Sequence, residues 1–174
     1  MATVLIVEVA FDPERWHEFF VATVGALAAL TGLLFVAMSL HLRSILSHPV
    51  LHRRAAITLA ALTIAMLVAG IALVPGIEAS TIGYILLAVV IISFALSLAV
   101  AFRGGSATVA DRALRLRVVG TLLMLVTGLY VALSLVLRSG PGLIALAALI
   151  GVTVLWSIVN CWELLGASFD EDLP

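Results

Sequence analysis

Five long apolar stretches alternate with short polar loops along this chain. Each stretch is close to the ~20 residues that an α-helix needs to cross the hydrocarbon core of a bilayer. The pattern therefore predicts an all-α, polytopic membrane protein, a bundle of five transmembrane helices. The expected spans are residues 20–40, 55–74, 82–102, 118–137 and 143–165.

The helix boundaries follow from capping and breaking residues. Asp12-Pro13-Glu14 starts the first helix, because aspartate caps an N-terminus and proline fits the first turn. That helix is expected to run to about Ile45. The second helix begins near Pro49 and is stopped by Pro75-Gly76.

Three segments result from these boundaries. Residues 1–12 are apolar but too short to span, and they are expected to form an extended or interfacial arm. Residues 13–167 form the five-helix transmembrane domain. Residues 168–174 form an acidic cytoplasmic tail.

The arginines predict how the chain is oriented, because basic loops stay on the cytoplasmic side. The two loops that follow the first and third spans carry seven arginines, and the opposite side carries two. The N-terminus is therefore expected outside and the C-terminus in the cytoplasm. The seven inner residues are Arg43, Arg53, Arg54, Arg103, Arg112, Arg115 and Arg117.

The composition supports a bilayer environment and narrows the partners. With 64% hydrophobic and 11% charged residues, the chain has too little polar surface to coat a soluble globule. A net charge of −1 and the lack of a basic tract argue against nucleic acid as a partner. One cysteine, Cys161, cannot form an intramolecular disulfide.

Small residues spaced about four apart let helix backbones approach closely in lipid. Such stripes either pack the five helices together or face a second copy or another membrane protein. The candidates are Gly25, Ala28, Ala29 and Gly32 on the first span, Ala61, Ala65 and Ala69 on the second, Ser93, Ser97 and Ala101 on the third, and Ala147 and Gly151 on the fifth.

Mild polar residues recur on the last two spans, and each needs a partner inside the membrane. They are expected either to assist helix packing or to line a pore. These residues are Thr127, Ser134, Thr153, Ser157 and Asn160.

The arginine loops offer a further candidate surface. Arg53, Arg54, Arg112, Arg115 and Arg117 either act as a topology signal or form a cytoplasmic rim for anionic lipid headgroups. In an oligomer, such a rim would favour anions at the mouth of a channel.

No catalytic or metal-binding constellation is expected. His17-Glu18 begins like a zinc-protease helix, but Val21 stands where the second histidine is required. His48 and His52 are separated by Pro49 and lack a third ligand. We therefore expect no catalytic residue, metal or cofactor, and no enzymatic activity.

The first half of the chain contains a recognisable series of motifs: Trp16-His17-Glu18-Phe19-Phe20-Val21, then Gly25-Ala26, residues 29–37, Arg53-Arg54 and Leu73-Val74-Pro75-Gly76. In these motifs the chain resembles a family of small bacterial polytopic membrane proteins of unassigned activity, often labelled modulators of the membrane protease FtsH. The resemblance implies the inner membrane of a bacterium and a regulatory role, and it brings no catalytic residues.

Two functions are compatible with these features. The first is a non-enzymatic regulatory or accessory subunit that packs against itself or a membrane partner. The alternative is a homo-oligomeric ion or small-solute channel with a Ser/Thr-lined pore and a cytoplasmic arginine rim. Membrane lipids are partners in either case.

Overall fold

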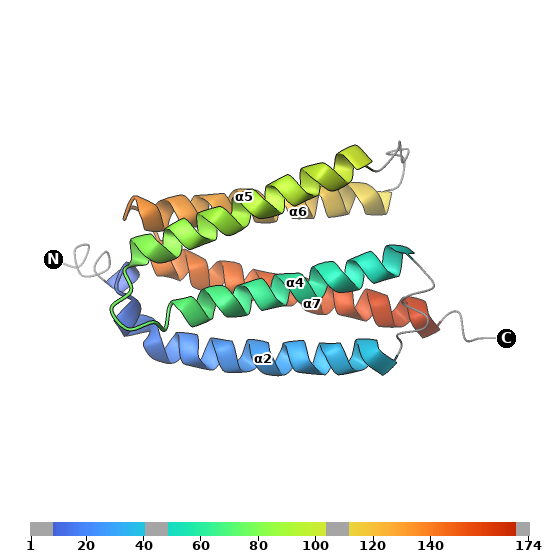
Figure 1. Ribbon diagram of the computed structural model, residues 1–174, viewed down its shortest axis with the longest axis horizontal. Coiled ribbons are helices and arrows are strands. Elements are labelled where there is room, and N and C mark those ends of the chain that lie inside the picture. The colour runs from blue at the N-terminus through green and yellow to red at the C-terminus, as the bar shows by residue number, and fades with distance from the viewer. Residues whose placement is uncertain (1–8, 41–48, 104–111, 170–174) are drawn as a thin grey trace. The chain divides into compact units, whose positions relative to one another are not determined.

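The computed structural model describes residues 9–40, 49–103 and 112–169, and within these ranges it contains helices and no strand. In the described part of the chain, Val9 and Ala10 are helical, a short 3₁₀ helix follows, and five α-helices come after it (Figure 1). The all-α prediction is confirmed. The elements are η1 (Pro13–Trp16), α2 (His17–Leu40), α4 (Pro49–Ile71), α5 (Ala79–Arg103), α6 (Arg112–Val136) and α7 (Gly142–Phe169).

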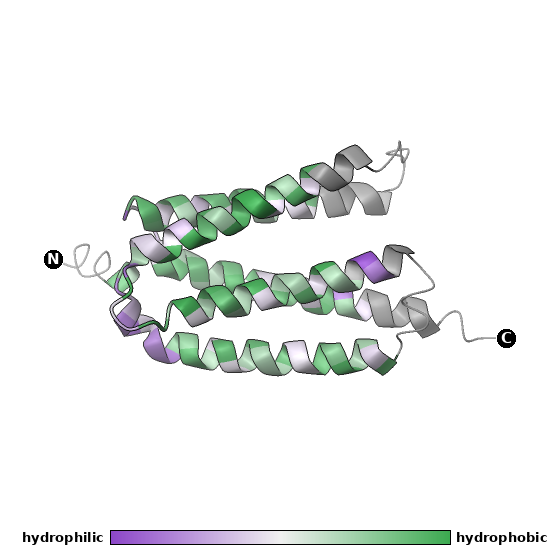
Figure 2. Ribbon diagram, viewed as in Figure 1, coloured by the Kyte–Doolittle hydropathy of each residue, from purple (hydrophilic) through white to green (hydrophobic). Residues whose placement is uncertain are grey.

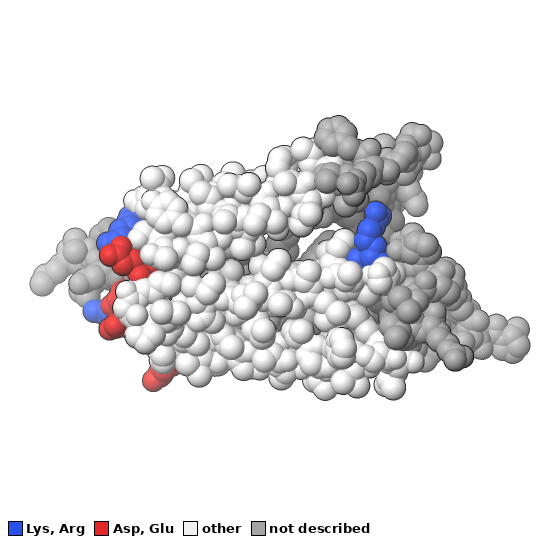
Figure 3. Space-filling model, in the orientation of Figure 1, with Lys and Arg blue, Asp and Glu red and all other residues white. Residues whose placement is uncertain are grey.

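Four of the helices are long and apolar enough to cross a bilayer. Their candidate spans are Pro13–Leu40, Ala79–Leu98, Val119–Val136 and Gly142–Trp162, and the apolar part of α4, Ala55–Ile71, is shorter. Figure 2 shows that hydrophobic residues predominate along these helices, and on the face that Figure 3 shows, white side chains of uncharged residues separate the charged ones near the N-terminal side from the arginine near the opposite side. The chain therefore has the helices of a membrane protein.

The second helix ends earlier than the sequence predicts. α4 stops at Ile71, three residues before the expected Val74. The N–H groups of Leu73 and Val74 bond to the carbonyls of Gly70 and Ile71, three positions back. These tighter bonds end the α-helix before Pro75. Pro75 has no backbone N–H to donate and so could not have continued the helix.

The chain divides into two compact units. Unit 1 comprises Met1–Pro13 and Gly76–Leu149, and unit 2 comprises Glu14–Pro75 and Ile150–Pro174. Unit 1 therefore contains α5, α6 and the start of α7. Unit 2 contains α2, α4 and the rest of α7.

In unit 1, α5 and α6 form an antiparallel hairpin with very close backbones. A Cβ placed on Gly83 would lie 2.8 Å from both Leu135 Cβ and the Val136 backbone nitrogen. One placed on Gly128 would lie 3.0 Å from Val90 Cγ2. Glycine permits this approach because a side chain would separate the helices.

In unit 2, α2 and α4 pack through faces on which buried residues are spaced three and four apart. The large buried side chains of α2 are Phe20, Leu27 and Leu34, whereas the buried face of α4 consists mostly of small residues. The expected stripe on the second span contributes to this face, because Ala65 and Ala69 are buried and Ala61 is half-buried. The buried residues of this face are Ala55, Thr58, Leu62, Ala65 and Ala69 of α4, together with Ala72 just after the helix.

The end of the N-terminal arm lies against the start of α7. Val9 and Ala10 are helical rather than extended, and Ala10 is buried. The Ala10 carbonyl occupies the space where Gly142 would carry a side chain. Residues 1–8, the expected end of the first helix near Ile45, and residues 170–174 of the acidic tail lie outside the described residues.

Candidate functional site

The small-residue stripe of the first span forms an exposed face of α2. Gly25, Ala28, Ala29 and Gly32 are all exposed. Gly25 precedes the buried Leu27 by two residues, and at 3.6 residues per turn the two point about 160° apart. Among the described atoms, none lies within 4 Å of a Cβ placed on Gly25 or Gly32. The described part of the chain leaves this face uncovered.

An aromatic cluster lies at the beginning of the same helix. The Trp16 and Phe19 rings meet edge to face with centroids 5.5 Å apart, and Phe19 and Phe20 do the same at 5.5 Å. Phe20 is fully buried while Phe19 is exposed. The cluster therefore has one ring in the buried face of α2 and one on its surface. Aromatic side chains at the surface are typical of the membrane interface.

Ser134 on α6 secures the turn that leads into α7. Its hydroxyl donates to the Ser139 carbonyl at 2.6 Å and accepts from the Gly142 N–H at 3.1 Å. In the same turn, Arg138, Gly140 and Gly142 have positive φ values of 48°, 88° and 52°. Sequence reasoning missed this role, although the Gly140-Pro141-Gly142 sequence signals a tight turn.

Thr127 lies on the same helix as Ser134 and is half-buried. It stands seven residues before Ser134, about two helical turns away, and so lies on the same face of α6. Both residues belong to unit 1.

On α7, the polar residues continue the buried apolar face. Leu143, Leu146 and Ile150 are buried, and Thr153, Ser157 and Asn160 follow at the same spacing of three and four. Ser157 is buried, while Thr153 and Asn160 are half-buried and Asn160 donates to the Trp156 carbonyl at 2.8 Å. The Asn160 bond lies within α7 itself, so helix packing and a pore lining both stay predictions for these residues.

The arginine rim falls mostly outside the described part of the chain. Arg53 and His52 are exposed near the start of α4. The side chains of Arg54, Arg112, Arg115 and Arg117 are outside the described residues, as is His48. Within the described ranges, no group of three or more His, Cys, Asp or Glu side chains could hold a metal ion.

Comparison with known proteins does not add an identity. No family model matches the chain, and no curated protein or solved structure matches it. The resemblance of the first half to small bacterial membrane proteins remains an expectation from the residues alone.

Proposed function

We propose that this chain is a non-enzymatic membrane protein that acts as a regulatory or accessory subunit by packing α2 against a second copy or another membrane protein. The observation that carries this proposal is the uncovered face of Gly25, Ala28, Ala29 and Gly32. Helices in lipid associate through close packing, and small residues allow the closest approach. The resemblance to membrane-protease modulators points to the same role.

The proposal includes five membrane crossings in the inner membrane of a bacterium, with the N-terminus outside. α4 must then also cross the membrane, as the second of the five spans, although its apolar part covers only Ala55–Ile71. Arg53 lies just before this segment and is exposed, so its long side chain can reach the interface and compensate for the short apolar length.

The orientation can be tested with single cysteines in a Cys161→Ser background. Ser139 and His52 are both exposed, and the proposed orientation assigns them to opposite sides of the membrane. A membrane-impermeant maleimide should label Ser139→Cys in intact cells and His52→Cys only after permeabilisation. The reverse pattern, or labelling of both in intact cells, would refute the orientation.

The packing role can be tested by blocking the α2 face. Gly25→Leu and Gly32→Leu place bulk on this face, and Gly151→Leu places the same bulk at an exposed position on α7. The mass of each variant should be measured in lipid nanodiscs prepared without detergent stripping. We expect the wild type and Gly151→Leu to form a complex, with itself or with another protein, that the two α2 variants lose. A wild-type protein that is monomeric and without a protein partner would contradict the proposal.

A further inference from the structure

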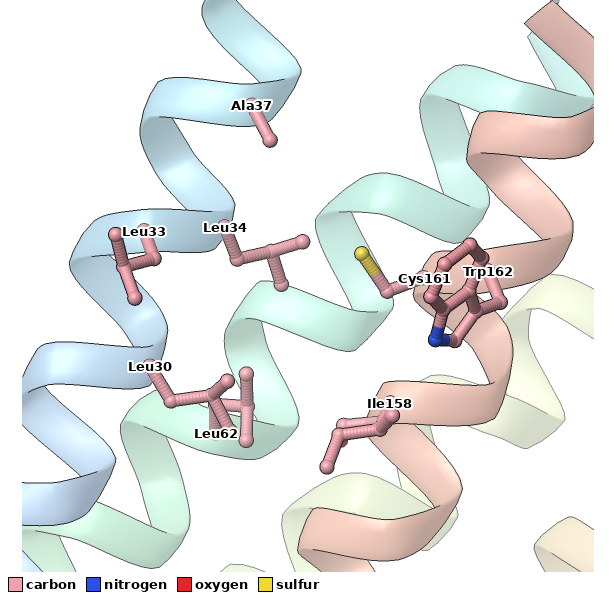
Figure 4. Close-up of a pocket in the computed structure, with 9 residues that line it drawn as sticks. Leu30, Leu33, Leu34, Ala37, Leu62, Ile158, Cys161 and Trp162 are labelled. Atoms are coloured by element: carbon pink, nitrogen blue, oxygen red, sulfur yellow. The ribbon is translucent and has the colours of Figure 1, made fainter.

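A groove runs along unit 2 between α2 and residues 157–162 of α7 (Figure 4). Its α2 side consists of Leu30, Leu33, Leu34 and Ala37, and α4 adds Leu62. The cavity volume is about 210 Å³. All of these residues are apolar.

The α7 side adds little polarity. Ile158, Cys161 and Trp162 line the groove together with Ser157. Ser157 is only 2% exposed, and its enclosed hydroxyl has no hydrogen-bond partner among the described residues. A resident water needs roughly two to four polar partners, which this lining does not offer. The groove is therefore suited to an apolar occupant.

The position of the groove defines the surrounding medium. Its α2 and α7 walls lie within the candidate spans Pro13–Leu40 and Gly142–Trp162. In a bilayer the groove is surrounded by lipid tails, and leaving it empty would deprive its walls of dispersion contacts. Apolar cavities of about 150 Å³ already bind benzene, so this larger one can hold several methylene groups.

The surroundings point to the occupant. Both long walls of the groove belong to candidate membrane spans, so the molecules that reach the groove in a bilayer are lipids, whose tails are as apolar as its lining. A cavity volume of about 210 Å³ can take a stretch of one hydrocarbon chain.

We propose that the acyl chain of a bilayer lipid occupies this groove, in the leaflet where α7 ends. Trp162, 72% exposed, stands at its rim, and exposed tryptophans mark the headgroup level. From Ala37 to Leu30 the α2 wall extends about 10 Å, within the ~15 Å hydrocarbon depth of one leaflet. This inference rests on the proposed membrane insertion and not on the proposed packing role of α2.

The test uses a phosphatidylcholine that carries a diazirine midway along one acyl chain. Wild-type protein is reconstituted in this lipid and irradiated, and the adducts are mapped by mass spectrometry. We expect adducts to concentrate on residues 30–37 and 157–162 compared with residues 91–96 of α5, which are largely exposed. Equal adduct yields in these segments would overturn the proposal.

Filling the groove provides the matched comparison. Ala37→Phe occupies the groove, whereas Ala60→Phe makes the same change at an exposed position of α4, about 160° around that helix from the groove residue Leu62. Ala37→Phe should lower the groove adducts by about tenfold, the effect of excluding about two methylene groups from contact. Ala60→Phe should leave the adducts unchanged.

A second groove variant is available in case the first one does not fold. If Ala37→Phe loses its helical circular dichroism, Leu33→Trp serves instead, since Leu33 is an exposed groove residue and tryptophan would cover the opening. A folded groove variant with wild-type adducts would refute the lipid site. Because both readouts require insertion, protein that stays outside the vesicles would instead refute the membrane architecture and with it this inference.

Discussion

Arg138 donates a hydrogen bond from Nη2 to Oε2 of Glu78 at 2.9 Å, joining residues sixty positions apart. Glu78 precedes α5 and Arg138 follows α6, so the pair closes one end of the α5–α6 hairpin in unit 1. The sequence predicts that both residues lie on the same side of the membrane. Their contact agrees with a shared end, because an antiparallel hairpin brings the start of one helix beside the end of the next.

This ion pair should contribute little stability. Its Arg138 and Glu78 side chains are 55% and 67% exposed, and pairs open to solvent typically contribute about 0–1 kcal/mol. A double-mutant cycle with Glu78→Gln and Arg138→Gln, followed by thermal unfolding in micelles, should give a coupling in this range that weakens with added salt. A coupling above about 2 kcal/mol would instead indicate a desolvated pair.

Gly83→Ala should destabilise the hairpin by about 1–3 kcal/mol, the usual cost of overpacking. The added methyl would meet Leu135 and the Val136 backbone at 2.8 Å, and the backbone cannot move aside without separating the helices. Gly70→Ala is the control, because no described atom lies within 4 Å of its Cβ. Unfolding in the same micelles should show Gly70→Ala unchanged or slightly stabilised. Equal stability of the two variants would argue against the close approach.

Ser134→Ala and Ser157→Ala should differ in their effect on the free energy of unfolding, although both serines are buried. Loss of the Ser134 hydroxyl leaves the buried Gly142 N–H without its acceptor, which costs about 1–3 kcal/mol. Loss of the Ser157 hydroxyl removes a buried group without a partner among the described residues and should be neutral or stabilising. Thermal unfolding of both variants provides the check. A marked loss of stability in Ser157→Ala would show that its hydroxyl is satisfied in the membrane.

The same two variants bear on the channel alternative. If the hydroxyls line a pore, both substitutions should alter solute flux through protein reconstituted in liposomes. We expect no flux that depends on either residue. The Ser134 hydroxyl already makes two hydrogen bonds in the turn that follows α6, and the Ser157 hydroxyl is buried.

Gly142→Ala should be the most damaging of the glycine substitutions. Gly142 has a φ of +52°, which costs roughly 1–2 kcal/mol for an L-residue, and a side chain would collide with the Ala10 carbonyl and the Phe11 ring. Gly76→Ala separates the two effects, because Gly76 has a φ of +72° but no described atom within 4 Å of its Cβ. Unfolding should show Gly142→Ala less stable than Gly76→Ala. Equal losses would mean that the N-terminal segment does not lie against α7.

The sequence predicts the helices and several of their ends because proline and glycine mark them. Pro49 begins α4 as expected, and α7 begins at Gly142, one residue before the predicted span. The early end of α4 depends on local hydrogen-bond geometry near Gly70, which the position of Pro75 does not reveal. The two hydrogen bonds of the Ser134 hydroxyl likewise depend on the backbone of the following turn, in which three residues have positive φ values.

The packing faces were harder to predict than the helices. In a soluble helix, polar residues would mark the outer side, but lipid is as apolar as a protein core, so both sides of α2 consist of apolar and small residues. The stripe of Gly25 and Gly32 was identified from its spacing, whereas its exposure emerged only from the structure. Gly83 was missed because one glycine in an apolar helix does not show what lies opposite.

Neither unit is built from one continuous piece of chain. Unit 1 joins the first residues to Gly76–Leu149, and unit 2 joins Glu14–Pro75 to Ile150–Pro174. Since synthesis proceeds from the N-terminus, α2 and α4 can pair early, but the last piece of each unit arrives only with α7. Neither unit can therefore be completed until α7 has been synthesised. A nonsense codon ahead of Gly142 would remove the α7 residues of both units, and we expect quality-control proteases to degrade such a truncated chain.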